Sequence, residues 1–174
     1  ALLVSHGAVR NPVPLDEFLG ALARGDTPSA RHWLIERPSW AEEQSDVISQ
    51  IVTDRIGRGE SGALETALEL GLDFNVPNAK GETPLHYAAI HGQLAAVKRI
   101  IGRGARLDFR DHTYHAQPLG WCVHGSIHFR SAGGDYPGVA AALLRAGAAV
   151  VPLPRDQVSP EMRAVFDALG QSPG

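Results

Sequence analysis

The chain has 174 residues, of which 44% are hydrophobic and 20% charged, and its net charge is −3. This length suffices for one well-buried domain, and the interleaved acids and bases form no basic stripe of the kind that binds nucleic acid. No apolar run approaches the ~20 residues of a membrane span. The one cysteine, Cys122, allows no internal disulfide, so we expect a reducing, cytoplasmic location.

Glycines recur along the chain at a nearly fixed spacing and divide it into similar units. Gly25, Gly59 and Gly92 are 34 and 33 residues apart, and Gly71 and Gly104 are 33 apart. The first set is expected to lie between two helices and the second after the second helix, because glycine adopts left-handed backbone without a Cβ penalty. We predict a partial repeat or N-terminal cap at 1–11, repeats at 12–45, 46–78, 79–111 and 112–151, and a C-terminal cap at 152–174.

The third unit shows the pattern most clearly. Thr83 is expected to cap its first helix, with Pro84 at the first helical position. In its second helix, the leucine, valine and isoleucine residues between 94 and 101 fall on one helical stripe. One unit cannot bury such a stripe by itself, so neighbouring units must stack.

The fourth unit is longer than the others. Gly104 and Gly147 are 43 residues apart rather than 33, while Gly125 aligns with Gly92. We therefore place an insertion at 126–135, between the two helices of this unit, and expect the chain to turn at Gly125.

Two further helix starts carry capping residues. Asp135 is expected to cap the second helix of the fourth unit. Ser159, followed by Pro160, is expected to cap a C-terminal helix that closes the exposed end of the core.

The segments TPLHYAAIHG at 83–92 and IIGRGARLDFRD at 100–111 resemble the signature of the ankyrin-repeat family. The chain resembles a bacterial-type ankyrin repeat domain with an insertion in its last full repeat, and the likeness weakens over 12–42. The resemblance implies an all-α solenoid of about four helix-turn-helix repeats with a C-terminal capping helix. It also implies that His86 bonds backbone between adjacent repeats.

The family usually binds proteins, so the resemblance implies a protein-protein interaction module that holds a polypeptide on its concave face and loop tips. A regulatory domain of a larger protein is one form of that role. Asp111 is expected at the exposed loop tip, and Trp121 is expected either to face the groove or to pack under the insertion. The candidate partner-binding residues are Tyr87, His91, Arg110, His112, Tyr114, His115, Trp121, His124, His128 and Phe129.

A different function class remains open, a small-molecule-binding or hydrolytic site formed by the insertion over the last full repeat. His124 would be the acid-base residue and Asp135 would orient it, which requires a hydrogen bond between them beside an enclosed cavity. Ser126 completes a possible triad, although no G-x-S-x-G motif is present. The sequence favours the binding role over an enzyme.

We expect no metal site and no cofactor. His112 and His115, together with Cys122 and two later histidines, match no zinc-ligand spacing, and no phosphate-binding loop is present. The expected partner is a protein rather than a nucleic acid or a membrane, and the oligomeric state is left open.

Overall fold

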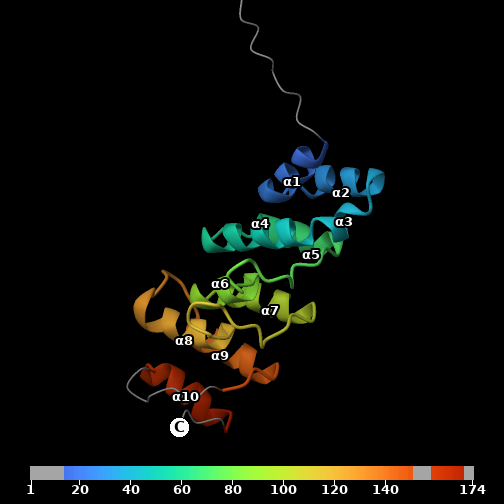
Figure 1. Cartoon of the computed structure of the whole chain (residues 1–174). Helices are drawn as coiled ribbons and strands as arrows, with labels where there is room; N and C mark the ends of the chain where they lie inside the picture. The colour runs from blue at the N-terminus through green and yellow to red at the C-terminus, as the bar shows by residue number, and fades with distance from the viewer. Residues whose placement is uncertain (1–13, 151–157, 171–174) are drawn as a thin grey trace, which may run out of the picture.

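The computed structural model describes residues 14–150 and 158–170, which form helices and no strands. The predicted all-α solenoid is confirmed, and the segment 1–11 lies outside the described residues. The helices, labelled in Figure 1, are α1 (Pro14–Arg24), α2 (Thr27–Glu36), α3 (Trp40–Glu43), α4 (Ser45–Gly57), α5 (Gly62–Leu70), α6 (Pro84–Ile90), α7 (Leu94–Gly102), α8 (Pro118–His128), α9 (Tyr136–Arg145) and α10 (Pro160–Ala168).

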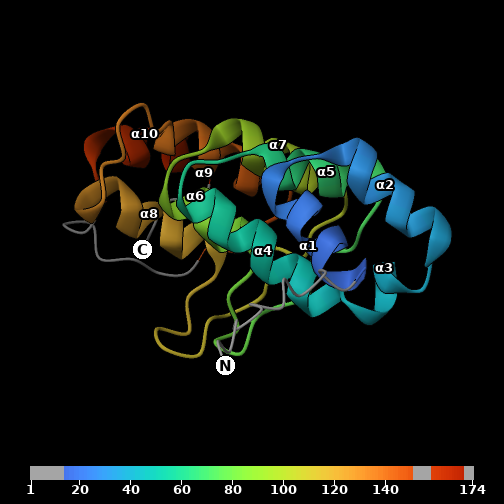
Figure 2. The same ribbon diagram turned by 90° about the horizontal axis from the view of Figure 1, so that it is seen from above.

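The helices stack in successive pairs along the chain. The first helices α4, α6 and α8 contact one another in order, and α7 contacts α9 on the other side of the stack (Figure 1). Seen from above, the loops that lead into α6 and α8 project from the same edge of the stack (Figure 2). The buried leucine, isoleucine, valine, alanine and phenylalanine side chains form a continuous core from α1 to α10.

The predicted turns between paired helices are present in the first three units. Gly25, Gly59 and Gly92 have φ values of 73°, 78° and 65°. Gly104 follows the end of α7 with φ 78°, as predicted for a glycine after a helix.

The predicted turn at Gly125 is wrong, because α8 continues through this residue to His128. Gly125 is buried against the end of α6, where any Cβ would collide with the Ile90 carbonyl. Glycine at this position serves close helix approach rather than chain reversal. The reversal comes later, at Arg130 (φ 44°) and Gly133 (φ 76°). The first three residues of the segment 126–135 therefore extend α8, and the rest form a loop.

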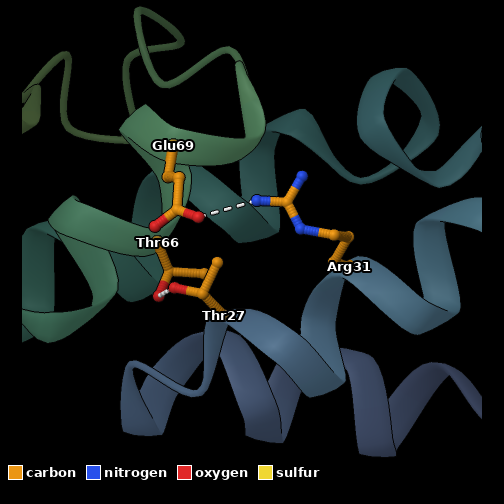
Figure 3. A network of polar contacts seen from close by, with 4 residues as sticks. All are labelled: Thr27, Arg31, Thr66 and Glu69. Carbon is orange, nitrogen blue, oxygen red and sulfur yellow. Dashed lines mark hydrogen bonds and ion pairs between the residues drawn. The ribbon is translucent and has the colours of Figure 1, made fainter.

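Polar contacts join neighbouring units on the side of the second helices (Figure 3). The hydroxyls of Thr27 and Thr66 lie 2.8 Å apart, and the Arg31 guanidinium pairs with Glu69 at 2.7 Å. Both members of the ion pair are exposed, so it contributes little to stability. This network orders α2 against α5 and forms part of the scaffold.

All three predicted N-caps are confirmed. The Asp135 carboxylate accepts the Gly138 N–H at 2.8 Å, and the Ser159 hydroxyl accepts the Met162 N–H at 3.3 Å. Thr83 also precedes α6 as its N-cap.

Candidate functional site

The loop between α7 and α8 is organised by Asp111, whose carboxylate accepts four hydrogen bonds. Oδ1 accepts the N–H groups of Thr113 (2.9 Å) and Tyr114 (2.6 Å). Oδ2 accepts the Ala116 N–H (3.1 Å) and the Trp121 indole N–H (3.0 Å). Asp111 is only 1% exposed, so its predicted place at the exposed tip is wrong. It holds the loop from within and leaves the tip to its neighbours.

Burial and hydrogen bonding act in opposite directions on Asp111. Burial raises the pKa of its carboxyl, but the bonds from the Tyr114 N–H, the Trp121 indole and the two other backbone donors outweigh burial and lower the pKa. Asp111 is therefore a carboxylate at neutral pH, and its charge strengthens these bonds.

This loop tip contacts the tip of the preceding loop. The His112 N–H donates to the Lys80 carbonyl at 2.8 Å, and the His112 Nδ1 lies 3.2 Å from the Ala79 carbonyl. Gly81 faces the Arg110 carbonyl so closely that a Cβ there would lie 2.6 Å from it. We call residues 78–82 and 110–116 together the finger ridge; it contains the predicted site residues Arg110, His112, Tyr114 and His115.

Three aromatic rings join the finger ridge to α6 and α8. The Trp121 ring lies 5.2 Å from the His86 ring and 5.5 Å from the Tyr87 ring, between ring centres. Trp121 thus packs beneath the finger ridge, so the expectation that it packs under the insertion is wrong. The Tyr87 hydroxyl donates to Glu82 at 3.1 Å, and burial together with the Glu82 charge raises the pKa of Tyr87 to about 12.

His86 bridges two successive units, as the resemblance implied. Its Nδ1 accepts the Thr83 N–H at 3.1 Å, so its Nε2 carries the proton that faces the Ala116 carbonyl at 3.3 Å. Burial lowers the pKa of His86 and keeps the ring neutral, which matches this tautomer.

The remaining predicted residues gather at the other end of α6 and α8. The Phe129 ring lies 5.8 Å from the His91 ring and 6.1 Å from the His124 ring, and His124 lies 4.3 Å from His128. The His91 Nδ1 is 3.2 Å from the Ser131 hydroxyl. We call these five residues the insertion cluster.

Two histidines of the insertion cluster have lowered pKa values. Burial alone lowers the pKa of His91, while burial and then the neighbouring charge of His128 lower the pKa of His124. Phe129 is 53% exposed beside these rings. The cluster is therefore a partly exposed aromatic surface. The lowered pKa values of His91 and His124 favour their neutral rings.

The residues of the hydrolytic alternative are not brought together. Asp135 caps α9, the Ser126 hydroxyl donates to the Val123 carbonyl of its own helix at 2.7 Å, and the structure has no hydrogen bond between His124 and Asp135. Tyr136 is buried, with its hydroxyl accepting the Ser131 N–H at 2.9 Å.

No metal centre is assembled either. Cys122 is buried and its Sγ lies 3.4 Å from the Tyr136 carbonyl, and burial raises the pKa of this thiol. Within residues 14–150 and 158–170, no group of three or more histidine, cysteine or acidic side chains could hold a metal ion.

An open hollow of about 780 Å³ lies at the far end of the stack, between α1 and α2. It is lined by Asp16, Glu17, Arg24, Pro28, Ser29, His32 and Trp33. None of the predicted site residues borders it, so it provides no cavity for His124.

The repeat geometry is matched by known proteins. Residues 59–101 match the family model described as ankyrin repeats in many copies. A crystal structure of an ankyrin repeat domain from Acinetobacter baumannii superposes with a TM-score of 0.63 over 88% of this chain and 80% of that one, at 19% identity. The segment 59–101 is thus similar to ankyrin repeats, and the described chain has the fold of an ankyrin repeat domain.

Two curated proteins are similar over shorter stretches. YahD of Escherichia coli, named as an ankyrin repeat protein, is 34% identical over 56 residues, 32% of this chain and 28% of that protein. Dynein axonemal heavy chain 12 of Bos taurus is 32% identical over 68 residues, 39% of this chain and 19% of that protein. The match thus spans less than a third of either relative.

Ankyrin repeats are generally protein-interaction modules. Within residues 14–150 and 158–170, no helix is both long and apolar enough to cross a bilayer.

Sequence reasoning missed two carboxylates that shape the finger ridge, Asp111 as its organiser and Glu82 as the partner of Tyr87. The Asp111 signal was present locally, because an aspartate followed by a short polar loop commonly bonds the N–H groups of the next residues. The Trp121 bond had no local signal, since it depends on how the loop folds back onto α8.

Proposed function

We propose that this protein binds a polypeptide partner on the finger ridge and the adjoining faces of α6 and α8. The observation that carries this proposal is Tyr114, which is 77% exposed on a loop that Asp111 holds through three backbone bonds. An aromatic side chain on an ordered loop loses little freedom on binding, and tyrosine and arginine are enriched among the residues that dominate interfaces.

Two strained backbone positions support the same surface. His115 in the finger ridge has φ 52°, and Arg130 beside the insertion cluster has φ 44°, although neither is glycine. Such conformations cost free energy and tend to be retained at functional sites. We propose the insertion cluster as a second contact area, centred on the exposed Phe129 ring.

We extend the proposal to a regulatory role if the chain forms one domain of a larger protein, because the same surface would then hold the regulated segment. We also propose a cytoplasmic location, which the single buried Cys122 supports. Among the described residues, no contact favours the small-molecule or hydrolytic alternative.

Site-specific photo-crosslinking tests the proposed surface. A photoreactive amino acid would replace Tyr114 in one variant and Ile35 in another; Ile35 is 70% exposed on α2, away from the finger ridge. In lysate of the source organism, we expect a discrete protein adduct from position 114 and not from position 35. Excess unlabelled protein should compete for this adduct, and excess Tyr114→Ala protein should compete much less well.

The variant with the photoreactive residue at position 35 is the control for folding and concentration of the variant at position 114. Identical adducts from both, or an adduct that Tyr114→Ala protein displaces as well as the wild type does, would overturn the assignment of the binding surface.

A further inference from the structure

The finger ridge separates its charges, with acids inside and bases outside. Its two carboxylates, Glu82 and Asp111, are 8% and 1% exposed. Glu82 accepts bonds from the Asn78 amide (3.0 Å) and the Tyr87 hydroxyl (3.1 Å). Asp111 accepts three bonds from its own loop and one from the Trp121 indole on α8. Both carboxylates therefore bond groups of the protein itself and stabilise the conformation of the ridge.

The cationic and imidazole side chains of the ridge are all exposed: Lys80, Arg110, His112 and His115. They share one surface, because the His112 N–H bonds the Lys80 carbonyl and the Arg110 Nη1 donates to the His115 carbonyl at 2.8 Å. The latter bond fixes the guanidinium beside the loop that carries Tyr114.

The permanent cations of the ridge have no acidic partner. The ion pairs of the described residues involve Arg31, Arg55, Arg99 and Arg106, not Lys80 or Arg110. The formal charges of the ridge cancel, but its two acids are buried and its two permanent cations are exposed, so the surface of the ridge is basic on a chain whose net charge is −3.

We propose that the finger ridge binds an acidic, extended polypeptide segment. Its carboxylates would pair with Lys80 and Arg110, and an apolar side chain beside them would cover Tyr114. Arginine binds carboxylates through paired N–H groups, and complementary charge speeds association and selects among partners. This inference rests on the proposed function and specifies its partner.

Charges around the ridge define the course of the segment. Asp54 on α4 lies close enough to Tyr87 for its charge to contribute to the raised pKa of that side chain. Asp108, two positions before Arg110 in the chain, is paired with Arg106 at 3.0 Å. An acidic segment would therefore run along the two loop tips rather than down onto α4.

A nucleic acid fits this surface less well than an acidic peptide does. Phosphate-backbone binding depends on several lysine and arginine contacts, and the ridge offers two permanent cations. The two histidines add charge only where the pH protonates them.

Selection from a random peptide library tests the inference without assuming a sequence. Displayed short random peptides would be selected on the intact protein and, in parallel, on the Lys80→Ala/Arg110→Ala variant. The matched control is Lys98→Ala/Arg103→Ala, which removes two exposed cations near α7 on the side of the second helices. Equal melting temperatures would confirm that all three proteins are folded.

We expect the wild type and the control variant to enrich peptides rich in aspartate and glutamate, and the ridge variant to lose that enrichment. A synthetic peptide from the selected pool should bind at least about tenfold more weakly when its acids are replaced by glutamine and asparagine.

Each other outcome has its own meaning. An enriched pool without acidic bias, or an acidic pool that survives Lys80→Ala/Arg110→Ala, overturns the acidic inference while the interaction module stands. Failure to enrich any peptide overturns the inference; if the Tyr114 crosslink then also fails, the proposed function falls too. Binding of a thymidine oligonucleotide more tightly than the best peptide would replace the peptide with a phosphate-bearing partner.

Discussion

Replacing Asp111 with alanine should destabilise the protein and disorder the loop of the finger ridge at 110–116. The substitution removes the acceptor of four hydrogen bonds from a site that is 1% exposed. A hydrogen bond to a charged group contributes about 1.5–3 kcal/mol. The three backbone donors regain water once the loop opens, so the four contributions do not add.

We expect the free energy of unfolding to fall by about 3 kcal/mol, mostly from the Trp121 indole bond and the lost order of the loop. For a chain of this size, that corresponds to a melting temperature roughly 6–12 °C lower. Chemical denaturation followed by circular dichroism measures the change. Asp108→Ala is the matched control, because Asp108 is an exposed neighbour paired with the exposed Arg106, and its loss should have little effect.

The same substitution has a defined pH dependence. The folded-state pKa of Asp111 is lowered because its hydrogen bonds outweigh burial, so its contribution is complete above the unfolded-state pKa of about 3.9. The contribution is lost as the pH falls through the folded-state value. The stability difference between wild type and Asp111→Ala should therefore be constant near neutral pH and shrink below about pH 4.

Two results would refute the reasoning about Asp111. A change no larger than that of Asp108→Ala would mean that the buried carboxylate does not hold the loop. A stability difference that grows as the pH falls would mean that its folded-state pKa is raised rather than lowered.

Three further predictions concern backbone and caps. Gly102→Ala should stabilise the protein by about 0.5–1 kcal/mol, and Gly104→Ala should destabilise it by about 1 kcal/mol. Both sites have open space for a Cβ, but only Gly104 has a positive φ, 78°. Equal shifts of the two melting temperatures would contradict this. Arg130→Gly should raise the free energy of unfolding by about 0.5–1 kcal/mol, because glycine adopts φ 44° without strain. A lower denaturant midpoint would show that the lost bond from the Arg130 side chain to the Ile127 carbonyl outweighs the relieved strain. Ser159→Ala should cost about 1 kcal/mol by uncapping α10, whereas Ser159→Asp should retain stability; an unchanged midpoint for the alanine variant would refute the cap.

The sequence predicted the helix pairs well because they depend on local signals. Thr83 and Pro84 mark the start of α6, and the apolar stripe of α7 has the helical period. Gly92 and Gly104 turn the chain where their alignment placed them. These features require only the sequence of their own unit and the need to stack.

Gly125 shows where the pattern was insufficient. A glycine after an apolar helix can reverse the chain or let another backbone approach, and both uses look the same in a sequence. Here the Ile90 carbonyl occupies the space that a Cβ would need, so the helix continues. The close approach arises from the stacking of α8 on α6, which local pattern does not contain.

In the candidate site too, positions that depend on local sequence were predicted better than contacts that depend on how the chain folds back. His124, His128 and Phe129 were all named as candidate partner-binding residues, and the structure brings them into one cluster. Trp121 was misplaced, because its indole bond is made to Asp111, ten residues earlier along a loop.

The insertion loop is fixed both by the preceding unit and by its own. The Asp135 N–H donates to the Gly92 carbonyl at 2.9 Å, and the His91 ring contacts the Ser131 hydroxyl. The Ser131 N–H in turn donates to the buried Tyr136 hydroxyl. Both exposed areas of the proposed surface are thus held by buried anchors, Asp111 for the finger ridge and Tyr136 for the insertion cluster. Since ordering a loop opposes binding, a surface ordered before the partner arrives retains more of its contact energy as affinity.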